Sequence, residues 1–412
     1  MFFNLLFLLY TLIYLPYLLL TGRWYKGYGS RLGLFSSELQ ARLKGNSNIW
    51  IHAVSVGEIM AIAPVVAQIK ARFPNQSIVV TVTTKTGYAL AQSKLAQSAI
   101  VLASPLDFSW VTSFFVRLIN PKIYIAAETE IWPNLFNCLS KRKVPIVIIN
   151  GRISDRSFGR YKAIKIFLSK TLQKVSLFCM QSDIDANRII ELGAIKQKVL
   201  VLGNLKFDDL VLSQENVNEL PAPKNRLLWI AGSTHPGEEE IVLKIFSQHK
   251  DSCALMIAPR HVERSEQIAQ LVQSKGLKAV RFSQLSSNSW SSDTVVIVDT
   301  IGHLRSLYSK ASFVFVGKSL CGGGGQNIIE PAFYAKPIIV GPMMENFRDI
   351  TELFKNKDAI VQVKDAEQLE YEVGYLLKDE NVRTQLGRKA LEVVKANQGA
   401  LDRTLKILER WL

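Results

Sequence analysis

Cysteine and histidine are scarce in this sequence of 412 residues, which contains four cysteines and five histidines. The cysteines lie far apart and form no CxxC pair: Cys138, Cys179, Cys253 and Cys321. A disulfide framework or a zinc site needs such residues in closely spaced groups, so the sequence favours neither. Isolated thiols in or beside apolar segments suit a reducing cytoplasm. We expect no metal and no cofactor.

Acidic residues are outnumbered, because 35 Asp and Glu stand against 50 Lys and Arg and give a net charge of +15. This excess favours partners of negative charge, such as an anionic membrane surface or an acidic ligand. A nucleic-acid-binding protein gathers its basic residues into a stripe with interleaved aromatics. The basic residues here are scattered along the chain, so we expect no nucleic-acid partner.

Charge is absent from residues 1–22, which are rich in Leu, Phe, Tyr and Ile. About 20 apolar residues are enough for a helix to cross the hydrocarbon core of a bilayer. The segment lacks the basic start and the small-residue cleavage site of a secretory signal, and Arg23, Lys26 and Arg31 follow it. We predict that residues 1–22 form a membrane anchor helix, either spanning or monotopic, with the rest of the chain on the cytoplasmic side.

Beyond residue 48, short apolar runs alternate with longer amphipathic ones, which is typical of parallel sheets covered by helices. A polar stretch with two prolines, residues 213–225, interrupts this pattern and is the best candidate for a linker. The sequence therefore predicts two Rossmann-like α/β domains, residues 23–212 and 226–412, that face an interdomain cleft. The predicted strands are 49–53, 77–83, 100–103, 123–127, 146–150, 177–181, 227–231, 254–258, 294–298, 313–316, 338–340 and 360–363.

Three charged residues of the first half are candidates for chemistry. Glu58 follows the first predicted strand and is either a first-turn acid favoured by the helix dipole or a general base. Glu128 ends the fourth predicted strand and would face the cleft if Glu130 caps the next helix, although both could be solvated loop acids. Lys206, before the linker, is either a surface charge or a cation placed against developing negative charge.

The second half offers groups suited to an anion. Arg260 ends a predicted strand, and arginine binds phosphate with two parallel hydrogen bonds. Four glycines, residues 322–325, precede a predicted helix that contains Asn327 and, one turn in, Glu330. The exposed backbone N–H groups of the glycine run and the positive end of the helix dipole favour a phosphate, and the Glu330 carboxylate could accept hydrogen bonds from a ribose. Residues 231–235 could meet phosphate or cap a helix. Asp183-Ile184-Asp185 matches the DxD metal motif, but its place at a helix start makes capping the simpler interpretation.

Seven motifs, in this order, resemble those of the 3-deoxy-D-manno-octulosonic acid (Kdo) transferase family: HAVSVGE, AETEIWPN, NGRIS, GNLKFD, AGSTHPGEE, APRH and GGGGQNIIEPA. The resemblance extends over nearly the whole chain. It implies a GT-B glycosyltransferase fold, with an acceptor site in the first domain and a nucleotide site in the second, anchored to the inner membrane. The implied reaction transfers Kdo from CMP-Kdo to lipid IVA without a metal, and a single carboxylate base implies inversion at the anomeric carbon.

The same resemblance implies roles for individual residues. Glu58 falls at the position of the proton acceptor, and Glu128 and Lys206 at those of transition-state stabilisers. The residues implied to hold CMP are Pro259, Arg260, Ile301, Gly302, His303, Asn327, Ile328, Ile329 and Glu330.

Three positions depart from the family pattern. Gln326 stands where the family commonly has His, His303 where it commonly has Glu, and Lys318 where it tends to have Gly. If nucleotide contacts there use side chains, affinity or nucleotide preference would change, although Lys318 could add attraction to phosphate. The glycine run and Glu330 alone do not exclude an alternative, another GT-B transferase or an epimerase that uses a UDP-sugar.

Overall fold

The computed structural model describes residues 28–45, 47–208, 223, 226–286 and 289–412. The chain divides into a first unit, residues 1–212 with 398–412, and a second unit, residues 213–397. The predicted anchor and nearly all of the predicted linker lie outside the described residues, and the predicted cleft between domains stays a prediction. Within the described ranges, no helix has the length and apolarity needed to cross a membrane.

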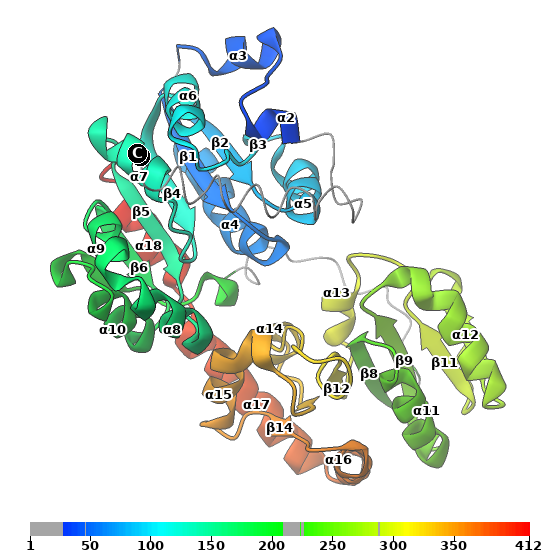
Figure 1. The fold of residues 1–412 in the computed structure, drawn as a ribbon. Helices are drawn as coiled ribbons and strands as arrows, with labels where there is room; N and C mark the ends of the chain where they lie inside the picture. The colour runs from blue at the N-terminus through cyan, green and yellow to red at the C-terminus, as the bar shows by residue number, and fades with distance from the viewer. Residues whose placement is uncertain (1–27, 46, 209–222, 224–225, 287–288) are drawn as a thin grey trace. The chain divides into compact units, whose positions relative to one another are not determined.

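The first unit contains a seven-stranded parallel sheet in the order β3-β2-β1-β4-β5-β6-β7 (Figure 1). Its central strands are continuous runs of β-branched and other apolar residues, as expected for strands covered by helices on both faces. One buried cluster contains Ile49 and Ile51 and the other contains Trp50, because successive side chains point to opposite faces. The strands are β1 (Asn48–Ala53), β2 (Ser77–Val82), β3 (Ile100–Ala103), β4 (Pro121–Ala127), β5 (Ile146–Gly151), β6 (Leu177–Met180) and β7 (Val199–Val201).

Half of the helices of the first unit begin with a serine or threonine whose side chain accepts a backbone N–H, as Ser55, Thr84 and Ser182 do. These caps fix where each connecting helix leaves its strand. The helices are α2 (Tyr28–Arg31), α3 (Ser37–Leu43), α4 (Val56–Arg72), α5 (Lys85–Leu95), α6 (Ser109–Ile119), α7 (Pro133–Lys141), α8 (Asp155–Ala163), α9 (Lys165–Leu172), α10 (Asp183–Glu191) and α18 (Ala400–Leu408), with short 3₁₀ turns η1 (Lys196–Lys198) and η2 (Leu205–Phe207).

The second unit repeats this architecture with a parallel sheet in the order β10-β11-β9-β8-β12-β13-β14. Its strands are β8 (Leu227–Thr234), β9 (Cys253–Pro259), β10 (Lys278–Arg281), β11 (Thr294–Ile297), β12 (Phe313–Val316), β13 (Ile338–Val340) and β14 (Val361–Gln362). Its helices are α11 (Glu238–His249), α12 (Ser265–Ser274), α13 (Leu304–Tyr308), α14 (Ile329–Phe333), α15 (Arg348–Lys355), α16 (Ala366–Lys378) and α17 (Glu380–Asn397), with η3 (Val262–Arg264), η4 (Phe282–Gln284) and η5 (Glu345–Phe347).

The C-terminal helix differs from the sequence-based division, which assigned everything from residue 226 to 412 to the second domain. Residues 398–412 belong to the first unit, where Leu401 and Leu405 of α18 join the core beside α4. The buried carboxylate of Asp208 accepts from the backbone N–H groups of Gly399 and Leu401, both at 2.7 Å. These contacts join residues about 190 positions apart, which no local sequence pattern reveals.

Candidate active site

The carboxyl ends of β1 and β4 form the topological switch point of the first sheet, because the chain leaves β1 for β2 on one side while β4 pairs on the other. Ligands of doubly wound sheets bind outside the strand ends at such a point. Glu58 lies in the first turn of the helix after β1 and Glu128 follows β4, so the fold brings two predicted site residues to neighbouring strand ends.

Glu58 has its carboxylate held at the start of α4. The backbone N–H of Val54 donates to Oε2 at 2.7 Å, and the Ser55 hydroxyl donates to Oε1 at 2.9 Å. The Ser55 hydroxyl also accepts from the backbone N–H of Glu58 at 3.4 Å, which makes this segment a capping box. A carboxylate oxygen has two acceptor positions, so each oxygen keeps capacity for another bond. Glu58 therefore caps its helix, and its role as a base stays a prediction.

Two further acids surround Glu58. Burial raises the pKa of Glu58 to about 7, and the nearby charge of Glu128 adds to this rise. Glu130 also has its pKa raised to about 7, by burial and by the charges of Glu58 and Glu128. Burial and the proximity of like charges disfavour ionisation of Glu58 and Glu130. The first unit thus contains a cluster of three carboxyl groups, of which the sequence analysis treated Glu130 only as a possible cap.

Glu130 does not cap α7. That helix begins at Pro133 after Trp132, which makes no side-chain capping bond. The carboxylate of Asp107, more than 25 positions earlier, accepts instead from the backbone N–H groups of Asn134 at 3.0 Å and Leu135 at 2.8 Å. A cap from a distant loop leaves Glu130 with the other two acids.

Glu128 adopts a positive φ of 54°, a backbone conformation that is unfavourable for a residue with a side chain. Such strain persists only where surrounding structure enforces it, and it is frequent at functional sites. The Glu128 Oε1 lies 3.9 Å from the Nζ of Lys206. The structure therefore brings together Glu58, Glu128 and Lys206, the three residues predicted to be catalytic.

A chain of amide side chains positions Lys206. The Gln181 side chain donates to the backbone carbonyl of Asn150 at 2.9 Å and accepts from the Asn204 side chain at 3.0 Å. Asn150 Oδ1 then accepts from the backbone N–H of Leu205, and Asn204 Oδ1 from that of Lys206, both at 3.0 Å. Asn150 and Asn204 lie in the motifs NGRIS and GNLKFD, but the sequence analysis did not identify these positioning roles, because the partners become neighbours only in the folded sheet.

Asp185, the second acid of the DxD-like pair after β6, is held by capping contacts. Asp185 Oδ1 accepts from the backbone N–H of Ile153 at 2.7 Å, and its Oδ2 accepts from the Ser182 hydroxyl at 2.5 Å. Ser182 caps the same helix through the backbone N–H of Asp185. The capping interpretation accounts for Asp185.

In the second unit, the ends of β8 and β12 form the corresponding switch point. The fully buried carboxylate of Glu238, at the start of α11, lies there among backbone N–H groups. Its Oε2 accepts from His235 at 2.9 Å and Lys318 at 2.7 Å, and its Oε1 accepts from Ser319 at 3.0 Å, Leu320 at 3.0 Å and Cys321 at 3.2 Å. Glu238 thus fixes the loop that leads into the glycine run, a role that the sequence analysis missed.

The glycine run has positive φ at all four positions, from 68° to 105°. The φ of 105° at residue 324 favours glycine, and a β-carbon there would also displace the end of the Asn346 side chain, whose Nδ2 lies 2.5 Å away. The helix that follows, α14, covers Ile329–Phe333, so it contains Glu330 as predicted but begins after Asn327. Asn327 caps it by accepting from the backbone N–H of Ile329 at 3.1 Å, and its amide donates to Glu330 at 3.1 Å.

Basic side chains gather around these strand ends. The rings of His235 and His261 lie 5.9 Å apart, and burial together with the charges of Lys318, His261 and Arg264 lowers the pKa of His235. Arg260 is exposed, and Arg264 pairs with the buried carboxylate of Glu239 at 2.7 Å. Lys318, two residues beyond the end of β12, has a positive φ of 55° and extends toward Gly324. The edge is therefore basic, which suits an anion.

The remaining residues predicted to hold CMP lie at the same strand ends but differ in access. Pro259 ends β9, and Ile301, Gly302 and His303 lie between β11 and α13, with Ile301 82% exposed. The side chains of Ile328 and Ile329 are fully buried, so only their backbone groups could contact a ligand.

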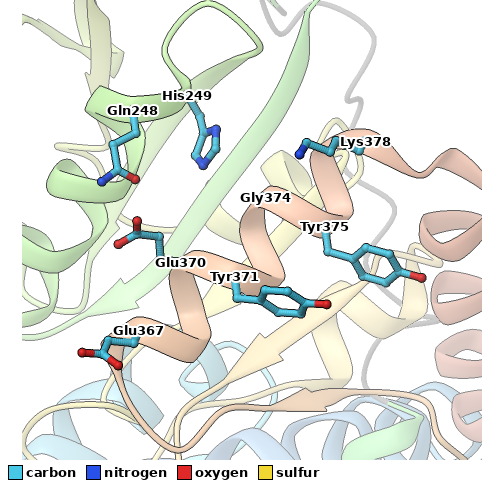
Figure 2. A pocket seen from close by; sticks show the side chains of 8 residues that line it. All are labelled: Gln248, His249, Glu367, Glu370, Tyr371, Gly374, Tyr375 and Lys378. Atoms are coloured by element: carbon cyan, nitrogen blue, oxygen red, sulfur yellow. The ribbon is translucent and has the colours of Figure 1, made fainter.

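A separate surface pocket lies between α11 and α16 (Figure 2). It is lined by Gln248, His249, Glu367, Glu370, Tyr371, Gly374, Tyr375 and Lys378. Because α11 runs back from the carboxyl edge of the sheet, its C-terminal residues lie near the opposite, amino edge. None of the predicted site residues lines this pocket.

Comparisons with known proteins agree with this architecture. A sequence family described as 3-deoxy-D-manno-octulosonic-acid transferase (kdotransferase) matches residues 26–209. The 3-deoxy-D-manno-octulosonic acid transferase of Haemophilus influenzae is 35% identical over 378 residues, which cover 88% of this chain and 87% of that protein. A bifunctional glycosyltransferase/methyltransferase of Fusobacterium nucleatum is 37% identical over 334 residues, but the match covers 79% of this chain and only 52% of that longer protein.

Solved structures of low identity share the fold. UDP-GlcNAc 2-epimerase of Neisseria meningitidis is 12% identical with a TM-score of 0.61, and the match covers 88% of this chain and 100% of that one. Acinetobacter baumannii MurG is 9% identical with a TM-score of 0.58, and the match covers 88% and 99%. The prediction of two parallel-sheet α/β domains resembling GT-B glycosyltransferases is confirmed.

Proposed function

The chain belongs to the Kdo transferase family, and on that premise we propose that it transfers Kdo from CMP-Kdo to lipid IVA with inversion at the anomeric carbon. The observation that carries this proposal is the grouping of Glu58, Glu128 and Lys206 at the switch point of the first sheet. The chain is a glycosyltransferase by family, while the donor, the acceptor and the residue roles belong to the proposal.

Glu58 is the proposed general base. A carboxyl group with a pKa of about 7 is partly ionised at neutral pH and holds an abstracted proton well, so it suits proton removal from a sugar hydroxyl. The bonds from Val54 and Ser55 fix the orientation of the carboxylate, and each oxygen keeps a second acceptor position for the incoming hydroxyl.

Glu128 and Lys206 are the proposed transition-state stabilisers. Departure of CMP leaves positive charge on the sugar ring and negative charge on the phosphate. A fixed carboxylate stabilises the first and a fixed ammonium group the second. The amide chain from Asn150 through Gln181 to Asn204 supports this role, because preorganised charges need no rearrangement during the reaction.

The second unit is the proposed donor site. Arg260 and Lys318 would bind the phosphate, and the hydrogen-bonded pair of Asn327 and Glu330 would meet the ribose. Pro259, the segment 301–303 and the backbone of Ile328 and Ile329 would contact the rest of CMP. Gln326 and His303, which depart from the family pattern, are proposed to contact the nucleotide through backbone groups. Residues 1–22 are the proposed inner-membrane anchor, with both units on the cytoplasmic side.

Incubation of a membrane fraction containing the chain with CMP-Kdo and lipid IVA, followed by mass spectrometry of the lipid, tests the reaction directly. We expect a lipid heavier by at least one Kdo residue, formed equally in the presence of EDTA. Competition binding distinguishes the alternative of a UDP-sugar enzyme, since CMP should compete for the donor site far better than UDP. Preference for UDP, or an unmodified lipid, would refute the proposal.

A further inference from the structure

Residue 374, in the middle of α16, is a glycine that the helix itself does not require. Its φ is not positive, and a β-carbon there would lie 3.7 Å from Cε1 and Nε2 of His249, which is ordinary contact and not a clash. Glycine in a helix interior destabilises the helix relative to alanine, because its backbone is freer in the unfolded chain. Gly374 therefore weakens α16 and leaves open space between this helix and His249 of α11.

That open space is the floor of the pocket in Figure 2, which is a trough along α16 with a volume of about 630 Å³. This volume lies within the range of sites for small molecules. Figure 2 shows Tyr371 and Tyr375 on one side of α16, and Gln248 and His249 of α11 on the other. The trough lies wholly within the second unit and near the amino edge of its sheet, away from the strand ends of the proposed donor site.

Two tyrosines leave an apolar surface uncovered along the trough. Tyr371 is 70% exposed and Tyr375 is 43% exposed, and their rings are nearly parallel, with centroids 6.4 Å apart. Single exposed aromatic residues are common, but neighbouring ones that line a pocket mark a place of interaction. Each ring offers an apolar face to a ligand together with a hydroxyl group.

The polar side chains of the trough have mixed hydrogen-bonding character. Among the described residues, none of these side chains has a hydrogen-bond or ion-pair partner. They are two carboxylates, an ammonium group, an amide and an imidazole: Glu367, Glu370, Lys378, Gln248 and His249. Carboxylates only accept, an ammonium group only donates, and an amide does both. A cation would meet Lys378 and an anion would meet the two acids, so a neutral ligand whose groups both donate and accept suits the set best.

We propose that this trough binds a neutral saccharide the size of a disaccharide. Hydroxyl groups both donate and accept, and the apolar face of a sugar ring fits against a tyrosine ring. Glu367 and Lys378 lie about 16 Å apart along α16 at 1.5 Å per helical residue, which exceeds the length of one sugar ring. This second site does not depend on the proposed reaction.

Saturation-transfer difference NMR on the full chain tests the proposal with maltose, cellobiose and N,N′-diacetylchitobiose. We expect transfer from the protein to at least one of these disaccharides, and about fivefold less transfer with Tyr371→Ala, because a stacking contact is lost. The control is Trp110→Ala, which removes an aromatic side chain that is 60% exposed at the start of α6 and should leave the signal unchanged. Any sugar site outside the trough would keep its signal in Tyr371→Ala, so the difference from the parent reports on the trough alone.

Filling the floor of the trough gives a second measure. Gly374→Leu should abolish the part of the signal that Tyr371→Ala reduces, while the melting temperature is not lowered, because leucine favours a helix more than glycine does. No transfer to any of the three disaccharides, equal signals in parent and Tyr371→Ala, or an equal loss in Trp110→Ala would each overturn the proposal.

Competition decides whether hydrogen bonding or charge attracts the ligand. Glu370→Gln should keep most of the signal and Glu370→Ala should lose several-fold, because the amide oxygen still accepts hydrogen bonds whereas a methyl group does not. Spermidine and citrate, each at the concentration of the disaccharide, should displace little of it. Displacement by spermidine or by citrate would show a site for a cation or an anion and would overturn the proposal of a neutral saccharide.

Discussion

In each unit the first strand of the sheet runs into a helix whose first turn contains a buried glutamate, Glu58 in α4 and Glu238 in α11. The Glu238 carboxylate accepts from five backbone N–H groups and serves the loop that it binds. The Glu58 carboxylate accepts from one backbone N–H and one hydroxyl, and has a pKa raised to about 7. The same position in the same topology thus gives a structural anchor in one unit and an acid of raised pKa in the other.

The charged side chains around the two glutamates also differ. Glu128 and Glu130 lie near Glu58, whereas His261, Lys318 and Arg264 lie around the loop that Glu238 holds. An edge with three acids is suited to accept a proton, and an edge with several bases is suited to bind an anion. The fold supplies the location, and the side chains decide its chemistry.

The largest effect is expected for Glu238→Ala. The variant leaves five buried N–H groups without their acceptor, which should cost about 3 kcal/mol or more and lower the melting temperature by roughly 6–12 °C. Thermal unfolding measures this loss, with Glu240→Ala, an exposed neighbour in α11, as the control. A melting temperature within a degree or two of the parent would show that Glu238 is not an anchor.

Glu58→Gln should reduce turnover about 100-fold or more while leaving the melting temperature nearly unchanged, because the amide keeps the shape of the side chain but is no base. Steady-state rates with CMP-Kdo and lipid IVA measure this, and Glu38→Gln in α3 is the control. Equal turnover in parent and variant would exclude Glu58 as the base.

The pH profile of the parent sharpens this test. Since the base must be ionised, kcat/KM should rise with pH up to about 7 and then level off, and the variant should lose this rise.

Stability changes in the opposite direction, because the folded-state pKa of Glu58 lies above the value of 4.5 expected of an unfolded glutamate. The folded state binds the proton more tightly, so the contribution of Glu58 to stability falls between pH 4.5 and 7.

Lys318→Gly should give the smallest effect, a gain in stability and a loss of affinity for CMP. Removing the side chain relieves the positive φ and should stabilise the chain by about 1 kcal/mol. The lost charge should weaken CMP binding about fivefold, by roughly 1 kcal/mol. Calorimetric titration with CMP measures the second effect, and Lys318→Gln, which removes the charge but keeps a side chain that disfavours this backbone conformation, separates the two. Unchanged CMP affinity in both variants would exclude a role for Lys318 in the donor site.

Buried strands and strand-end motifs were readable from the sequence, and two of the four edge strands were not. All the predicted strands coincide with strands of the structure, but β7 and β10 were missed. Both lie at a sheet edge and are partly exposed, and β10 reads Lys-Ala-Val-Arg, so neither forms the apolar run that marks a buried strand. The grouping of Glu58, Glu128 and Lys206 was predicted from the family motifs, whereas the addition of Glu130 was not.

The sequence by itself determined the order of strands and helices, because apolar periodicity and capping residues act over a few neighbouring positions. It also determined the family, since the motifs keep their order along the chain. Only the tertiary structure decided that α18 packs on the first unit, that Asp107 caps α7, and that Glu238 holds the loop before the glycine run. These contacts join residues that lie far apart in sequence, and a carboxylate among backbone N–H groups leaves no periodic signal that a sequence could show.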